Sequence, residues 1–108
     1  MKSDYVIGLD ISTSCTGVAA LDYRGNIIEF AYCKPKGDTL VKKADMMGEF
    51  ITDWTSSLSL GQPASVYIEQ NLQRFRRGFS SAQVINTLAR FNGMISYIAY
   101  RDIGVQPV

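Results

Sequence analysis

The 108-residue sequence contains no histidine and only two cysteines, Cys15 and Cys33. Without histidine, the chain has neither a nucleophile activated by imidazole nor a zinc site with imidazole ligands. Two cysteines make a poor disulfide framework, so we expect two reduced thiols. A metal bound by this chain would have oxygen ligands, which favours magnesium or manganese.

Long apolar runs and a strong charge imbalance are also missing. No run approaches the roughly 18 apolar residues of a membrane-spanning helix, and Asp4 and Asp10 interrupt the apolar stretch where a signal peptide would lie. We therefore expect a cytoplasmic protein with no membrane partner. A hydrophobic fraction of 46%, a charged fraction of 19% and a net charge of +1 are typical of a globular protein. We interpret residues 1–108 as a single domain.

Three strands are predicted in the first third of the chain. Residues 5–10, YVIGLD, form an apolar run that indicates a buried central strand. A tight turn at 11–15 leads to a second strand at 16–22. A hairpin connection at 23–26, which contains glycine and asparagine, leads to a third strand at 27–33. These segments predict a three-stranded antiparallel meander.

Two helices and one short strand are predicted to follow. Apolar residues spaced three and four apart indicate both helices. Because one helix joins the third and fourth strands, we expect a right-handed crossover and a parallel strand pair. The fold class is therefore α/β, a mixed sheet with flanking helices. The expected bounds are a helix from Asp38 or Thr39 to about Ser57, a strand at 65–69, a helix from Ser80 or Ser81 to about Asp102, and the start of another strand at 105–108 after Gly104.

Two carboxylates, Asp10 and Glu69, each end a predicted strand. The carboxyl ends of neighbouring parallel strands lie at the same edge of a sheet, so the two side chains can converge there. Two oxygen donors on rigid elements can hold a hard divalent cation such as Mg²⁺ or Mn²⁺. The alternatives are a turn aspartate that caps backbone N–H groups and a glutamate at a solvated strand end.

Small hydroxyl residues follow Asp10 in the sequence. Ser12, Thr13 and Thr16 precede Gly17, and this combination would let a phosphate backbone approach closely. We therefore interpret these three residues as candidate DNA contacts. The alternative is that their hydroxyls satisfy backbone groups within a tight turn.

The segment after Glu69 is rich in arginine and aromatic residues. Arginines bind phosphates bidentately, and each neutralised phosphate adds salt-dependent affinity. An aromatic or leucine side chain among them can stack on an unpaired base or wedge into a junction. The alternative is aromatic packing on the sheet beside a solvated arginine loop. The predicted DNA-binding residues of this segment are Leu72, Arg74, Phe75, Arg76 and Arg77.

Two motifs resemble those of a known family. The run Asp10-Ile11-Ser12-Thr13-Ser14-Cys15-Thr16-Gly17 fits D-x-S-x-x-x-T-G and resembles the first motif of RuvC-type Holliday-junction resolvases, while VYIEQ, with Glu69, resembles their second motif. The order of elements over residues 5–108 resembles the ribonuclease H-like fold. The resemblance implies a metal-dependent endonuclease that hydrolyses branched DNA, with Asp10 shared between two metal ions and Glu69 as the second ligand. It also implies that Leu72 or Phe75 faces the branch point, and that the enzyme acts as a homodimer.

The sequence departs from this family in its acidic residues. The family uses four carboxylates, two of them on a helix after the fifth strand, and this chain ends at Val108 before such a helix. Asp102 does not match the motif. We therefore expect a domain truncated before its C-terminal helix, with weak or no cleavage by these 108 residues alone.

Two other functions stay open at the level of sequence. One is a non-catalytic nucleic-acid-binding module of the same fold. The other is an actin-like or sugar-kinase phosphate-binding domain, because IGLDISTSCTG also resembles the opening motif of that group. Against the second, Ser12 stands where that group usually has glycine, and the chain is too short for two lobes. The sequence leaves open a four-way junction, a flap, a replication fork or RNA as the substrate.

Overall fold

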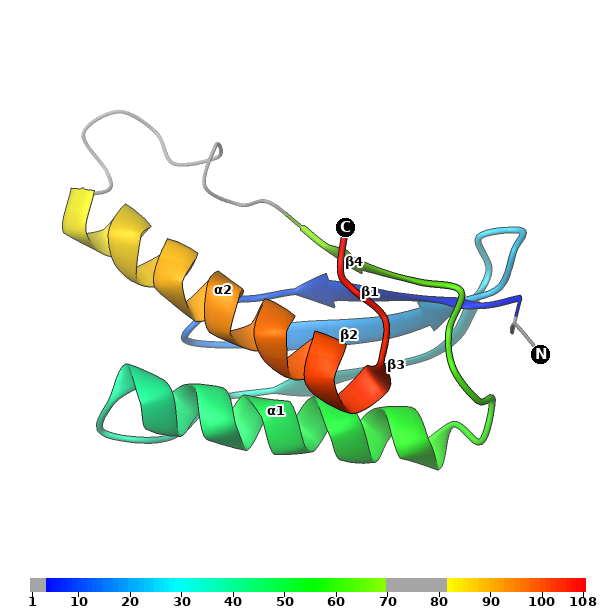
Figure 1. The fold of residues 1–108 in the computed structure, drawn as a ribbon, viewed down its shortest axis with the longest axis horizontal. Helices are drawn as coiled ribbons and strands as arrows, with labels where there is room; N and C mark the ends of the chain where they lie inside the picture. Colours follow the sequence, from blue (N-terminus) through cyan, green and yellow to red (C-terminus); the bar gives the residue numbers. More distant parts are fainter. Residues whose placement is uncertain (1–3, 70–81) are drawn as a thin grey trace.

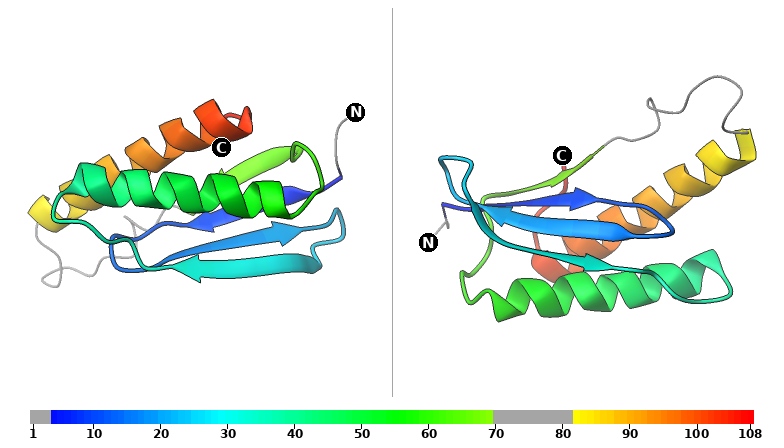
Figure 2. Two further views of the ribbon diagram at one scale, coloured as in Figure 1. Left: turned by 90° about the horizontal axis from the view of Figure 1, so that it is seen from below. Right: turned by 180° about the vertical axis from the view of Figure 1, so that it is seen from behind.

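The computed structural model of the protein describes residues 4–69 and 82–108. Four strands form one sheet, and both helices pack on the same face of it (Figures 1 and 2). The elements along the chain are β1 (Val6–Asp10), β2 (Thr16–Leu21), β3 (Ile27–Cys33), α1 (Leu40–Ser57), β4 (Ser65–Ile68) and α2 (Ala82–Ile103).

The sheet is mixed and has the strand order β3-β2-β1-β4. β1 pairs antiparallel with β2, and β2 pairs antiparallel with β3, with a register shift between Ala20 and Leu21. β4 returns to the other side of β1 and pairs parallel with it. The predicted meander and the predicted parallel strand pair are both confirmed, and α1 supplies the crossover between them.

The ends of the helices follow from local chemistry. Thr39, one of the two predicted caps, accepts a hydrogen bond from the backbone N–H of Lys42 and so caps α1. Gly104, at a φ of 87°, ends α2, because this left-handed backbone costs glycine little. The predicted caps of the second helix, Ser80 and Ser81, lie outside the described residues.

The last residues of the chain reach the free edge of β4. The backbone N–H of Val108 donates to the carbonyl of Val66 at 2.9 Å. Residues 105–108 do not form the predicted further strand, although Val108 makes this backbone hydrogen bond to β4.

The core lies between the sheet and the helices. Alternate residues of β1, β2 and β4 point toward the helices, as the period of two requires. Their side chains pack against apolar residues of α1 and α2 spaced three and four apart. The core includes Ile7, Leu9, Val18, Ala20, Val66 and Ile68 from the sheet, Ala44, Met47 and Ile51 from α1, and Phe91, Ile95 and Ala99 from α2.

The opposite face of the sheet is not covered by either helix (Figure 2). Neither described helix combines the length and hydropathy that a membrane span needs.

Candidate metal and nucleic-acid site

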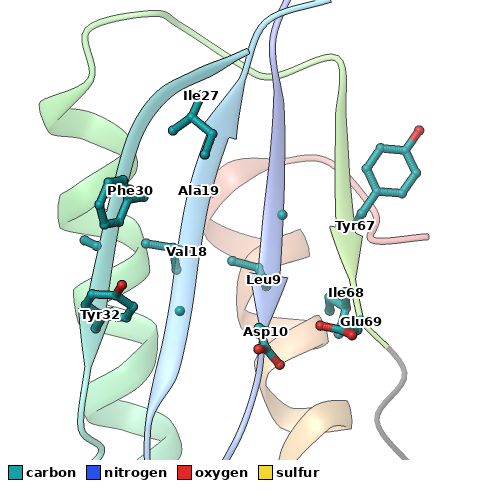
Figure 3. A pocket seen from close by; sticks show the side chains of 13 residues that line it. Leu9, Asp10, Val18, Ala19, Ile27, Phe30, Tyr32, Tyr67, Ile68 and Glu69 are labelled. Atoms are coloured by element: carbon teal, nitrogen blue, oxygen red, sulfur yellow. The ribbon is translucent and has the colours of Figure 1, made fainter. Parts of the chain in front are cut away.

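The register of β1 and β4 makes Asp10 and Glu69 neighbours. Asp10 is the last residue of β1, and Glu69 directly follows Ile68, which pairs with Leu9. The backbone N–H of Glu69 donates to the carbonyl of Leu9 at 2.9 Å, which extends the parallel ladder by one residue. Both carboxylates therefore stand at the same edge of the sheet and line the same hollow (Figure 3). The expectation that the two strand ends lie next to each other is confirmed.

The two carboxylates lie at one end of a shallow hollow on the uncovered face. Its volume is about 630 Å³. Its lining includes Gly8, Gly17 and Ala19 of the two central strands. Larger side chains of the outer strands flank it (Figure 3). These flanking residues include Phe30 and Tyr32 of β3 and Tyr67 of β4. The hollow is therefore largely apolar, with its charge concentrated at the end formed by Asp10 and Glu69.

Two of these flanking residues contact each other. The rings of Phe30 and Tyr32 pack edge to face with centroids 5.9 Å apart. Tyr67 was missed as a site residue, although a sequence signal for it exists. It lies two residues before Glu69, so the alternation of a strand puts both side chains on one face.

The turn between β1 and β2 is closed by hydrogen bonds from its own side chains. The Thr16 hydroxyl donates to the carbonyl of Ser12 at 3.0 Å and accepts from the backbone N–H of Ser12 at 3.2 Å. The Ser12 hydroxyl in turn accepts from the backbone N–H of Ser14 at 3.2 Å. These hydrogen bonds agree with the alternative interpretation of the sequence, in which the hydroxyls satisfy backbone groups within a tight turn.

The three predicted hydroxyl contacts differ in their exposure. Thr16 is fully buried, with 0% of its surface exposed, so in this structure its hydroxyl supports the turn and is not presented to a ligand. For this residue the burial favours the alternative, in which the hydroxyl satisfies backbone groups of the turn. Ser12 and Thr13 are half-buried, and their contact with DNA stays a prediction.

Lys43 of α1 also reaches this turn. Its ammonium group donates to the carbonyl of Thr13 at 3.5 Å. Sequence reasoning did not select Lys43, because it is remote in the sequence and belongs to an ordinary amphipathic helix. The contact brings a positive charge to the turn that follows Asp10.

The donor atoms of this edge suit a hard cation. Two carboxylates on adjacent strand ends supply oxygen ligands of the kind that Mg²⁺ and Mn²⁺ prefer. Within residues 4–69 and 82–108, no three acidic, thiol or imidazole side chains come together. Among the described residues, Asp10 and Glu69 are the two candidate ligands at this edge of the sheet.

Three further titratable residues, Cys15, Cys33 and Asp102, do not line the hollow. Cys15 and Cys33 are free thiols, as expected, and burial, reinforced by the nearby Cys15, raises the pKa of Cys33 against the opposing effect of Lys36. Asp102 accepts hydrogen bonds from Arg101 and Thr52, and the Arg101 guanidinium is the main cause of its lowered pKa. Asp102 does not line the hollow that contains the carboxylate pair.

The predicted arginine-rich segment follows Glu69 in the sequence. Its five selected residues, Leu72, Arg74, Phe75, Arg76 and Arg77, lie outside the described residues. Their DNA contacts stay predictions. Their position in the sequence, shortly after Glu69, is the observation on which those predictions depend.

Comparison with solved structures decides the fold. Thermus thermophilus RuvC in complex with a Holliday junction substrate superposes with a TM-score of 0.71 over 95% of this chain, at 14% sequence identity. The fold is that of RuvC. A second structure of Thermus thermophilus RuvC matches with a TM-score of 0.65 at 15% identity, again over 95% of this chain.

The RuvC-like fold is of the ribonuclease H-like type, as expected from the sequence. This chain spans 61% of the RuvC chain in both structures. A foamy viral protease-reverse transcriptase in complex with double-stranded DNA is also similar, with a TM-score of 0.52 at 19% identity, covering 98% of this chain and 23% of that one. No family model matches the sequence, and no curated protein matches it.

Proposed function

We propose that this RuvC-like domain belongs to a metal-dependent nuclease that hydrolyses DNA phosphodiester bonds. The observation that supports this most directly is the meeting of Asp10 and Glu69 at one edge of the sheet, on adjacent strands joined by the Glu69–Leu9 hydrogen bond. Two carboxylates on adjacent strand ends carry like charges, which repel each other. A divalent cation bound between them would remove that repulsion.

The proposed roles of the two acids are those of metal ligands. Asp10 and Glu69 would hold Mg²⁺ or Mn²⁺, and a bound divalent cation activates water and stabilises the leaving oxygen in phosphodiester hydrolysis. The chain's own contribution is to fix both ligands on rigid strand ends, which keeps their separation constant. The half-buried Ser12 and Thr13, in the turn that follows Asp10, are proposed to face the phosphate backbone.

Branched DNA is the proposed substrate. The RuvC fold, seen in a structure that contains a Holliday junction, supports this choice, and the arginine-rich segment after Glu69 provides residues suited to phosphate contact. Action as a homodimer and a cytoplasmic location are retained as predictions.

The substitution Asp10→Asn tests this function. We expect it to weaken Mn²⁺ binding by at least about tenfold, since mutation of residues that only orient a metal ligand already lowers metal affinity by that factor. It should abolish any metal-dependent cleavage of a synthetic four-way junction, yet preserve junction binding in a metal-free gel shift. The matched control is Asp53→Asn, which removes an exposed carboxylate of α1 outside the carboxylate pair.

Each result has a distinct meaning. Unchanged Mn²⁺ binding by Asp10→Asn would refute the metal site. Junction binding by the unmodified chain with no cleavage in Mg²⁺ or Mn²⁺ would favour the non-catalytic binding module. Equal loss of metal binding in Asp53→Asn would point to nonspecific charge effects in place of a site.

A further inference from the structure

Thr16 closes the turn that follows Asp10, and its buried hydroxyl makes hydrogen bonds as well as packing contacts. Thr16 is fully buried at the start of β2, opposite Cys33 of β3. A valine would fill the same volume there. The Thr16 hydroxyl instead makes two hydrogen bonds to one residue, Ser12, using both the carbonyl and the N–H of its backbone.

This arrangement restrains the chain on both sides of Asp10. Before the turn, Asp10 pairs with Gly17 in the β1–β2 ladder. After Asp10, the Ile11 side chain is buried with 1% exposure, and the next residue, Ser12, is held at both backbone groups by Thr16. The path of residues 10–12 is therefore defined by the ladder, by core packing and by the Thr16 hydroxyl.

The geometry points to a role for Thr16 as a positioning residue that fixes the Asp10 carboxylate for metal binding. This inference rests on the proposed function, in which Asp10 is a metal ligand. Metal ligands must be held within about 0.5 Å of a productive geometry, and the groups behind them supply that restraint. Thr16 touches neither the metal nor the substrate, and it acts through the backbone between Ser12 and Asp10.

The test compares three variants of the full chain with the unmodified protein. Thr16→Val keeps the volume and removes the hydroxyl, whereas Thr16→Ser keeps the hydroxyl and removes a methyl group. Ile51→Val is the control, because it trims a buried side chain of α1 and leaves the turn intact. Mn²⁺ affinity is measured by electron paramagnetic resonance, which detects free Mn²⁺, and thermal unfolding of each variant is recorded alongside.

We expect Thr16→Val to weaken Mn²⁺ binding by about 10- to 100-fold, the range found for groups that orient metal ligands. Thr16→Ser should bind Mn²⁺ nearly as the unmodified protein does. Ile51→Val should unfold at a lower temperature with unchanged Mn²⁺ affinity. Recovery by the serine variant separates positioning from a general loss of stability, because serine also removes buried apolar volume.

Failure of this inference can be distinguished from failure of the proposed function. If Thr16→Val binds Mn²⁺ normally while Asp10→Asn does not, Thr16 is structural only and the metal site stands. If Asp10→Asn also binds normally, the metal site itself is refuted. Should Thr16→Val not fold, hydrogen exchange of the unmodified protein decides. The Ser12 amide should be protected as strongly as the amides of β1, and rapid exchange there would overturn the inference.

Discussion

Replacing Gly48 with alanine tests how closely the two helices pack on each other. Gly48 is a buried residue of α1 that faces Ile98 of α2. A Cβ atom at position 48 would lie 2.7 Å from the Cγ2 atom of Ile98 and 3.0 Å from its Cδ1 atom. Since carbon atoms in contact are normally about 3.5–4.0 Å apart, Ile98 or the helix itself must move.

Two opposing terms determine the size of the effect. Alanine is favoured over glycine within a helix by about 1 kcal/mol, whereas overpacking a core typically costs about 1–3 kcal/mol. The predicted net change for Gly48→Ala therefore ranges from no effect to a destabilisation of about 2 kcal/mol. The matched control is Gly93→Ala in α2, where an added Cβ has nothing within 4 Å. That variant should be more stable than the unmodified protein by about 1 kcal/mol.

The assay is thermal or urea unfolding of the unmodified protein and both variants. In a domain of about this size, 1 kcal/mol corresponds to a shift in Tm of roughly 4–8 °C. Gly93→Ala should raise the Tm, and Gly48→Ala should leave it unchanged or lower it. In an Ile98→Ala background the obstruction is gone, so Gly48→Ala should then be stabilising. An equal rise in Tm for both variants in the unmodified background would refute the close packing of α1 on α2.

Three further predictions concern a helix cap, a turn and the arginine-rich segment. Thr39→Ala removes the cap of α1 and should lower the free energy of unfolding by about 1 kcal/mol, measured by urea denaturation. Asp22 accepts hydrogen bonds from the backbone N–H groups of Asn26 and Arg24, which lower its pKa. Its stabilising effect is present above the unfolded pKa of about 3.9 and lost as the pH falls through the lower folded value. The difference in Tm between the unmodified protein and Asp22→Ala should therefore be largest near neutral pH and shrink below pH ~4. Replacing Arg74, Arg76 and Arg77 with alanine should weaken junction binding and flatten the dependence of log Kd on log salt by roughly 0.9 per lost phosphate contact.

Each of these has a clear contrary result. An unchanged unfolding midpoint in Thr39→Ala would mean that the cap adds nothing to α1. A Tm difference for Asp22→Ala that stays constant between pH 7 and pH 2 would exclude the charged carboxylate as its source. An unchanged salt slope in the triple arginine variant would remove that segment from the DNA-binding surface, with Arg24→Ala on the β2–β3 hairpin as the matched control.

The sequence by itself determined the elements and much of the candidate site. Period-two and helical patterns are local, because they follow from the backbone geometry of strands and helices, and the described strands and helices agree with them closely. Asp10 and Glu69 could be selected from the sequence for the same reason, since each is the acid at the end of an apolar run. The crossover rule then predicted a parallel strand pair, in which the two acids converge if their strands are neighbours.

The tertiary structure decided the features that depend on contacts between distant segments. Both helices pack on one face of the sheet (Figure 2). Phe30, Tyr32 and Tyr67 are exposed and line the hollow on the other face (Figure 3). Thr16 turns its hydroxyl inward toward Ser12, although its sequence context equally suits a surface contact. Sequence patterns specify which side chains share a face, but burial on that face depends on what packs against it. The position of the two carboxylates at one edge of the sheet likewise required the pairing of β1 with β4, which long-range core packing makes favourable.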